Sequence, residues 1–490
     1  MTPLEFPFIS AKWVIGFFGL THTAVASLAI GIAFLVTVAQ VVAYRTRDRR
    51  FDLLAKRIQL IHVCIYNIGT ILAIGLVFAL SGLFPQFWTQ IFVHFFWPLI
   101  GEEFLFFLLA TTLTFHYFFW EHLWGHKKLH IALGAALTPL FLLQFYYING
   151  FGSFMLTPGF REAEVSIRSG IIGWDMAAFY NPSFLMLTFH RTFANVAYGG
   201  FVVAAICGVM LYTTRREKMV SYYEDGGRLA FGVGFMAFLS LPIVGYFYAH
   251  VLRGYANEAY VNLMWGKGDI IAGGIDWWWV KHLCVATMLG ASIRHFHATS
   301  HEESALPVPR IFVYAVAIFY ATFYLAMGMI MTWAFFWWML TAAIAGAFLA
   351  GHLRKTAGGS PRSVYILIGV LSFATVMLGG YAREASRPRF ENRISAHDKV
   401  YVPEERAPYL MVEVEPSDLP ARPPIPAPEV DKAVVLIRRN CSGCHTLDRI
   451  KKYQLRDWDL IVMQMRAYGL KITNDEADAI ALYLKSGQPY

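Results

Sequence analysis

Ten long apolar runs constrain this chain more than any other feature of its sequence. A run of about 20 apolar residues crosses a bilayer as one helix, because a helix satisfies its backbone hydrogen bonds internally. The eighth and ninth runs form one block from Ile311 to Leu353, in which we expect a turn near Thr332 and Trp333. The predicted fold is therefore all-α, a polytopic membrane helix bundle of about ten helices. The expected spans are 13–43, 58–83, 91–121, 129–149, 183–213, 229–252, 275–297, 310–331, 333–353 and 363–383.

The charge of the chain fits a membrane protein better than a nucleic-acid-binding protein. Only 15% of the residues are charged and 57% are hydrophobic, whereas a soluble domain is about one quarter charged. The net charge of +8 comes from short basic clusters between the apolar runs, which is the pattern of membrane topology. We therefore expect contact with membrane lipid and no binding of nucleic acid.

The basic loops also predict the orientation of the chain. Basic loops stay on the cytoplasmic side, and this places the N-terminus outside. An even number of spans returns the C-terminus to the same side. The first run shows no cleavage site for a signal peptide, so we expect it to remain in the mature protein. The expected location is a bacterial inner membrane, with both termini periplasmic. The basic residues are Arg45, Arg47, Arg49, Arg50, Lys56, Arg57, Lys127, Lys128, Arg215, Arg216 and Lys218.

The composition changes abruptly after Glu384, which predicts three parts. Residues 1–390 form the membrane domain, 391–430 a Pro-rich extended linker, and 431–490 a small soluble domain. The last part contains Cys441, Cys444 and His445 in the pattern Cys-x-x-Cys-His. Two thiols and one imidazole in this spacing are what covalent attachment of a c-type haem requires.

This C-terminal part resembles a mono-haem class I cytochrome c. The resemblance implies that His445 is the proximal ligand of the iron, and that Tyr483 and Leu484 in the last helix pack on the first helix. A Met beyond the motif is the usual distal ligand, and Met465 is the first candidate, with Met463 close behind. A zinc half-site or a redox pair is the alternative for the two cysteines, but no second Cys/His pair lies nearby. Single cysteines in the apolar runs are expected to be inert core residues: Cys64, Cys207 and Cys284.

Ionisable side chains within the apolar runs are the next candidates, because burying them in a membrane is costly. His22 lies in the first run and His190 in the fifth, where small residues that follow it would let a flat macrocycle approach the helix. Glu102 and Glu103 interrupt the third run. Histidine is a common axial ligand of haem iron, so these positions predict further redox centres.

These stretches, in this order, resemble subunit I of cytochrome bd-type quinol oxidases. The resemblance covers residues 10–215 well and 360–390 weakly. In that family a His ten residues after a basic residue, as His22 follows Lys12, binds the high-spin haem at the oxygen site. A His nine residues after Asn-Pro, as His190 follows Asn181, binds the low-spin b haem. The resemblance thus implies b-type haems, two or more, with haem d as a further option, and a quinol substrate.

The resemblance also implies roles for acidic residues at two helix positions. Glu102 would lie near the high-spin haems. Glu103 has no counterpart in the resemblance, but the two adjacent carboxylates could relay protons as a pair. Glu384, three residues before Arg387, would bind or support the other high-spin haem. The family keeps another Glu two helical turns beyond the first, and that position falls on or near Ala110 in this chain.

The second ligand of the low-spin haem also departs from the family pattern. The family uses a Met from the helix after the quinol loop, whereas this chain offers His282 near the outer end of the seventh run. We expect His190 and His282 to ligate one haem together, with His250 as the competitor. Lys281 and Arg191 could pair with haem propionates, as could Arg387, although basic residues at span ends also snorkel to the interface. Lone histidines are more often interhelical hydrogen-bonding residues than ligands, and this applies to His62, His94 and His116.

The expected function is that of a haem-containing membrane oxidoreductase of a respiratory chain. It would exchange electrons between quinol and a periplasmic c-type haem through b-type haems. A terminal oxidase that reduces oxygen to water is the alternative, and a non-catalytic electron-transfer subunit is the second alternative. Expected partners are a second bd-like membrane subunit and a periplasmic cytochrome or other redox protein.

Overall fold

The structure is a computed structural model whose described residues fall into two compact units, 1–396 and 397–490. The longer described stretches are 8–9, 11–157, 176–255, 271–272, 275–299, 333–385, 432–438 and 472–486. The remaining described residues are 260, 263, 313–315, 318–319, 322, 458 and 462.

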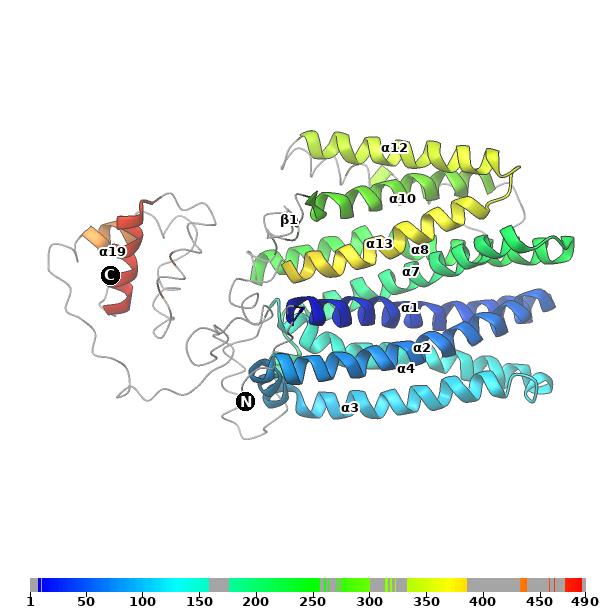
Figure 1. Cartoon of the computed structure of the whole chain (residues 1–490), viewed down its shortest axis with the longest axis horizontal. Coiled ribbons are helices and arrows are strands. Elements are labelled where there is room, and N and C mark those ends of the chain that lie inside the picture. The colour runs from blue at the N-terminus through cyan, green and yellow to red at the C-terminus, as the bar shows by residue number, and fades with distance from the viewer. Residues whose placement is uncertain are drawn as a thin grey trace. The chain divides into compact units, whose positions relative to one another are not determined.

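Long helices that run side by side build the first unit (Figure 1). They are α1 (Ala11–Thr46), α2 (Arg49–Leu83), α3 (Pro85–Phe118), α4 (Lys127–Phe154), α7 (Phe184–Thr213), α8 (Glu217–Tyr255), α10 (Trp277–Thr299), α12 (Trp333–Thr356) and α13 (Arg362–Ala385). Short elements join them: η1 (Trp124–His126), α6 (Met176–Phe179), and the antiparallel pair β1 (Ile271–Ala272) and β2 (Ile275–Asp276). The predicted all-α membrane bundle is confirmed.

Eight helices among the described residues are long and apolar enough to span a membrane. They coincide with eight of the ten predicted runs. The run 275–297 forms α10, which is not among the eight, and most of the run 310–331 lies outside the described residues. Helix α12 begins at Trp333, where the sequence predicts a turn. The total of ten spans stays a prediction.

Local chemistry sets where the helices begin and bend. Asp48 accepts a hydrogen bond from the backbone N–H of Arg50 at 2.9 Å, which caps α2 and starts it nine residues before the predicted span. The Arg50 guanidinium also donates to this carboxylate and holds the pKa of Asp48 below its ordinary value. Helix α3 is kinked at Phe95, three residues before Pro98, whose ring cannot donate a backbone hydrogen bond.

Small residues let the central helices approach closely. Helix α1 contacts α2, α4 and α7, while α7 contacts α8 and α13, so α1 and α7 form the centre of the bundle. At their crossing, a Cβ added to Gly31 would collide with the carbonyl oxygen of Asn195 and the Cα of Gly199. A Cβ on Gly200 would meet Gly234 of α8 at 2.6 Å. Such contacts are typical of packed membrane helices.

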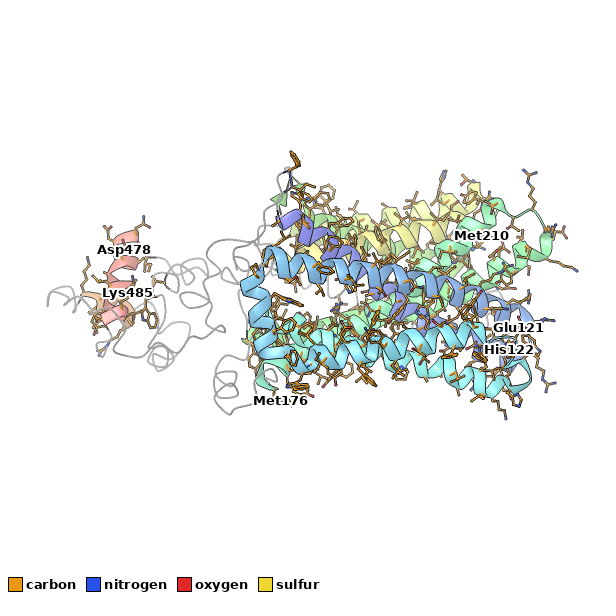
Figure 2. All side chains as sticks on the ribbon, turned by 60° about the horizontal axis from the view of Figure 1, so that its bottom comes forward. Glu121, His122, Met176, Met210, Asp478 and Lys485 are labelled. Carbon is orange, nitrogen blue, oxygen red and sulfur yellow. The ribbon has the colours of Figure 1, made fainter. Side chains whose placement is uncertain are left out.

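Ion pairs gather several basic loops at one end of the bundle, which we call the basic end. Arg50 pairs with Asp225 of α8 at 2.6 Å, and Lys56 of α2 pairs with Glu121, which lies between α3 and α4. Figure 2 shows Glu121 and Met210 towards this end and Met176 at the opposite one, which we call the far end. The connections α1–α2, α3–α4 and α7–α8 therefore share one side, as the charge pattern predicts.

The second unit contains helical residues 432–438 and helix α19 (Asn474–Ser486). Thr473 and Glu476 form a capping box at the start of α19, with N···O distances of 2.9 and 3.2 Å. The helix ends at Ser486, one residue before the predicted stop at Gly487. One core contains Tyr483 and Leu484 together with residues of the first helix, which agrees with the expected packing. That core comprises Ala433, Leu436, Ile437, Trp458, Val462, Ala477, Ile480, Ala481, Tyr483 and Leu484.

Candidate functional site

His22 in α1 has one ring nitrogen engaged and the other available. Its Nδ1 donates to the backbone carbonyl of Gly69 in α2 at 3.1 Å. This bond fixes the tautomer that leaves Nε2 with a lone pair, which is the arrangement of most metal-ligating histidines. A Cβ added to Gly16, Gly19 or Gly379 would meet no atom within 4 Å, so there is open space beside α1 and α13.

His190 in α7 is enclosed by α8. Its ring lies 5.9 Å from that of Tyr248, and a Cβ on Gly245 would come within 3.7 Å of its Nδ1. Within the described part of the chain this buried Nδ1 has no hydrogen-bond partner. Such a nitrogen costs free energy unless a ligand or another group engages it.

A hydrogen-bonded network at the far end fixes the start of α7 against the end of α4. Asn149 is fully buried, accepts from Arg191 Nη1 at 2.7 Å and donates to Thr188 at 3.1 Å. Asn181, from the Asn-Pro motif, donates to Ser153 Oγ at 2.8 Å. The motif residues thus position the helix turn that carries His190 and Arg191.

His282 in α10 is packed between aromatic rings. Its ring lies 4.4 Å from Trp278 and 5.5 Å from Phe335 of α12, and its buried Nε2 has no partner in the described regions. Its competitor His250 is exposed. The positive charge of Lys281 acts on the rings of both His190 and His282. The ring contacts described for His190 come from α8 and those of His282 from α10 and α12, so their joint ligation stays a prediction.

The acidic pair of α3 is split between two environments. Glu102 is partly buried and accepts a hydrogen bond from Gln144 of α4 at 2.6 Å, whereas Glu103 is exposed on the outer face of the helix. Ala110 packs against the apolar core that α1, α2, α3 and α4 share. Its side chain is a methyl group, so this position carries no carboxylate. The carboxyl groups of Glu102 and Glu103 both interact electrostatically with the hydroxyl of Tyr66 in α2.

A buried polar stripe runs along α2, and the sequence interpretation had missed it. We call it the α2 polar stripe: Asp52, Gln59, His62 and Tyr66, whose exposed fractions are 9% or less. The spacings of three, four and seven residues put all four on one helix face. The period is readable in the sequence, but Asp52, Gln59 and Tyr66 are not haem-ligand types and so do not stand out there.

Two further histidines adjoin this stripe near the basic end. His116 of α3 and His130 of α4 are stacked with ring centroids 4.4 Å apart. His130 Nδ1 lies 3.0 Å from Nε2 of Gln40 in α1, and its Nε2 donates to the carbonyl of His116 at 3.0 Å. Gly134 makes room for this cluster, because a Cβ there would come within 2.8 Å of Gln40 and His116.

Several predicted site residues are not described. Glu384 lies in the last turn of α13, but its side-chain placement is not described, and the same holds for His94 in α3. The others lie outside the described residues: Arg387, Cys441, Cys444, His445, Met463 and Met465. Their roles stay predictions.

The described residues of the first unit fit a haem. His22 offers a free Nε2 beside open space at glycines, and His190 offers a buried, unpartnered nitrogen. Lys281 and Arg191 supply cationic groups of the kind that pair with propionates. This donor set matches the axial ligation and charge that a b-type haem needs.

The sequence and the fold of this chain are each similar to those of a known protein. A protein of Bacillus subtilis (strain 168), described as a cytochrome bd menaquinol oxidase subunit I, is 24% identical over 254 residues. That match covers 49% of this chain, and the chain spans about half, 54%, of the relative's length. The bd oxidase of Geobacillus thermodenitrificans has a similar fold, with a TM-score of 0.53 at 18% identity over 77% of this chain and 86% of the other. Residues 10–260 match the family Cytochrome bd terminal oxidase subunit I. With eight candidate membrane spans and a family match over half of its length, this chain is a multi-pass membrane protein that belongs to the cytochrome bd terminal oxidase subunit I family.

Proposed function

We propose that the chain is a quinol-dependent haem oxidoreductase that exchanges electrons between membrane quinol and a c-type haem in its C-terminal unit. The observation that carries the proposal is the pair of histidines on neighbouring central helices, His22 and His190, each with one ring nitrogen available for iron. When bound there, b-type haems would supply one-electron chemistry between quinol and the next carrier. The family implies haem b and haem d together with quinol.

The protein's own residues would orient and balance such a group. The carbonyl of Gly69 holds the His22 ring in one orientation, and Asn149 pins Arg191 beside His190. Arg191 and Lys281 would compensate the negative charge of propionates in a low-dielectric environment. Glu102, held by Gln144, is the carboxyl group best placed to gain or lose a proton inside the bundle.

The C-terminal unit would provide the exit for electrons. Cys441 and Cys444 would bond covalently to haem c, with His445 and Met465 as axial ligands. This chemistry needs the periplasmic side, where the charge pattern predicts the C-terminus to lie. A periplasmic cytochrome or another redox protein would then be the partner.

A second membrane subunit would complete the complex. Glu103 is exposed on α3 within an apolar stretch, and an ionisable group at this depth is costly in lipid. A protein surface that covers this face of α3 would remove that cost. A bd-like second subunit is the partner that the family implies.

Oxygen reduction within the bundle is a second candidate function. Family membership favours it, and so does the α2 polar stripe, because oxygen reduction consumes protons that must enter the bundle. The replacement of the family's second Glu by Ala110 argues for the c-type route instead, since a direct carboxylate relay is interrupted there.

The test compares two acceptors with one preparation. Purified full-length protein is mixed with a short-chain quinol, and oxygen uptake is measured against reduction of an added soluble cytochrome c. We expect faster cytochrome reduction, and a haem-stained denaturing gel should show a band at the full-length mass. Rapid oxygen uptake that His22→Ala abolishes would establish the second candidate instead. Absence of the stained band would reject the c-type haem.

A further inference from the structure

The α2 polar stripe crosses much of the bundle. It begins at Asp52 near the basic end and ends at Tyr66, one turn before Gly69, whose carbonyl holds His22. Asp52 and Tyr66 are 14 residues apart in the sequence, which corresponds to about 21 Å along a helix. A buried helix face in a membrane protein is ordinarily apolar, so a polar one of this length calls for a physical role.

The entrance to the stripe is a buried ion pair at the basic end. Asp52 is 4% exposed, pairs with Lys127 of α4 and accepts a hydrogen bond from Trp120 Nε1 at 3.3 Å. The Trp120 ring lies 4.5 Å from His130 and 5.2 Å from His116. The carboxylate therefore stands one aromatic ring away from the stacked histidines.

The middle of the stripe carries buried groups that can exchange protons. His62 is fully buried, stacks on Phe141 at 5.2 Å and is electrostatically close to His116. The Oε1 atoms of Gln40 and Gln59 are buried, and neither has a hydrogen-bond partner within the described stretches. Buried acceptors of this kind usually bind internal water, which would connect the side chains between the histidines.

The last part of the stripe approaches the acidic pair. Tyr66 follows His62 by one helical turn, and its hydroxyl donates to the carbonyl of Phe106 at 2.9 Å. The ring is electrostatically close to Glu102 and Glu103. Glu102 in turn is hydrogen-bonded by Gln144. Polar side chains thus occur from the basic end to the level of Glu102, and Tyr66 belongs to the apolar cluster against which Ala110 packs.

We propose that the α2 polar stripe, with His116, His130 and Gln40, conducts protons from the basic end to Glu102 and the site of His22. This route would take the place of the carboxylate missing at Ala110. The inference rests on the proposed function, because it assumes a redox group beside His22. His62 is the residue of this route through which protons must pass.

The proton transfer at His62 is balanced. A neutral imidazole accepts a proton at one ring nitrogen and releases the proton bound to the other, so one N–H bond forms and one breaks. A rotation or a second exchange restores the first tautomer. Each electron added at the buried site by a quinol or by an artificial reductant is then matched by one proton, which avoids an uncompensated buried charge.

The test measures proton uptake when the purified protein is reduced. A metal-complex one-electron reductant, whose oxidation releases no proton, reduces the protein in a stopped-flow instrument while a pH-indicator dye reports protons taken from solution. We expect His62→Leu and His62→Gln to slow uptake by about a hundredfold, the low end for removing a positioned proton-transfer group. An amide hydrogen-bonds but does not carry a proton, so the Gln variant separates conduction from packing. Asn67→Leu, on the exposed face of the same helix, is the matched control and should leave the rate unchanged.

Absorbance spectra of the same samples separate the possible outcomes. Wild-type protein without b-type haem would overturn the proposed function, and this inference with it, whereas the outcomes below bear on the inference alone. Normal spectra with wild-type uptake rates in both His62 variants would overturn the inference. Loss of haem from both variants would overturn it as well, because His62 would then support the haem site itself.

Discussion

At the scale of single residues, buried polar groups distinguish this bundle from an inert membrane anchor. Lys127 and Asp52 form an ion pair whose side chains are 18% and 5% exposed. The Lys127 ammonium also lies 5.0 Å from the Trp120 ring and 5.2 Å from the Trp124 ring. A pair this enclosed holds the α3–α4 turn against the start of α2.

Lys127→Met should destabilise the bundle strongly, because it leaves the Asp52 carboxylate buried without a cation. The expected loss is about 3–5 kcal/mol, the usual cost of removing one partner of a buried pair. Thermal denaturation in detergent measures it. Adding Asp52→Asn to the variant should restore most of the stability, and the exposed neighbour Lys128→Met should have little effect. A Lys127→Met variant as stable as the wild type would show that the pair contributes nothing.

Sequence reasoning located individual histidines but not their neighbours. The flanking motifs of His22 and His190 sufficed to single them out, and the structure gives each an available nitrogen. From the sequence alone, His62 and His116 were expected to be ordinary interhelical residues, and His130 was not considered. Their association depends on which helix faces meet, and pattern alone does not specify helix rotation in a bundle that is apolar almost everywhere.

At the scale of helices, the apolar runs predicted the elements well and their ends less well. Helix α8 begins at Glu217, twelve residues before the predicted span, because its first turns are polar and lie at the basic end. Hydropathy indicates only the part of a helix that lies in lipid, whereas the backbone hydrogen bonds of the helix continue beyond that part. The close crossing of α1 and α7 was not foreseen, since it depends on Gly31 meeting Gly199 across the bundle.

Gly31→Ala should weaken this crossing, because the added methyl would collide with the backbone of α7. The expected destabilisation is about 1–3 kcal/mol, as for other overpacked interiors. The matched control is Gly232→Ala in α8, where a Cβ meets no atom within 4 Å. That change should be neutral or stabilising by about 0.5–1 kcal/mol, because alanine favours a helix. Equal melting temperatures for the two variants would argue against a close α1–α7 contact.

At the scale of the whole molecule, the chain combines a family membrane domain with a separate C-terminal unit. The family match covers residues 10–260, and the fold likeness extends over 77% of the chain. The C-terminal unit has its own apolar core around Tyr483 and Leu484. Under the proposed function each unit would hold its own haem, so the two spectral signals should be lost independently when one ligand is removed.

The most direct measurement is the reduced-minus-oxidised absorbance spectrum of the purified protein after addition of a quinol. Wild-type protein should show a low-spin b-type band and a c-type band. His190→Ala should lose the b-type band and keep the c-type band, whereas His250→Ala, whose ring is exposed, should keep both. An unchanged b-type region in His190→Ala, or a wild-type protein that quinol does not reduce, would contradict a quinol-dependent haem oxidoreductase built around His190.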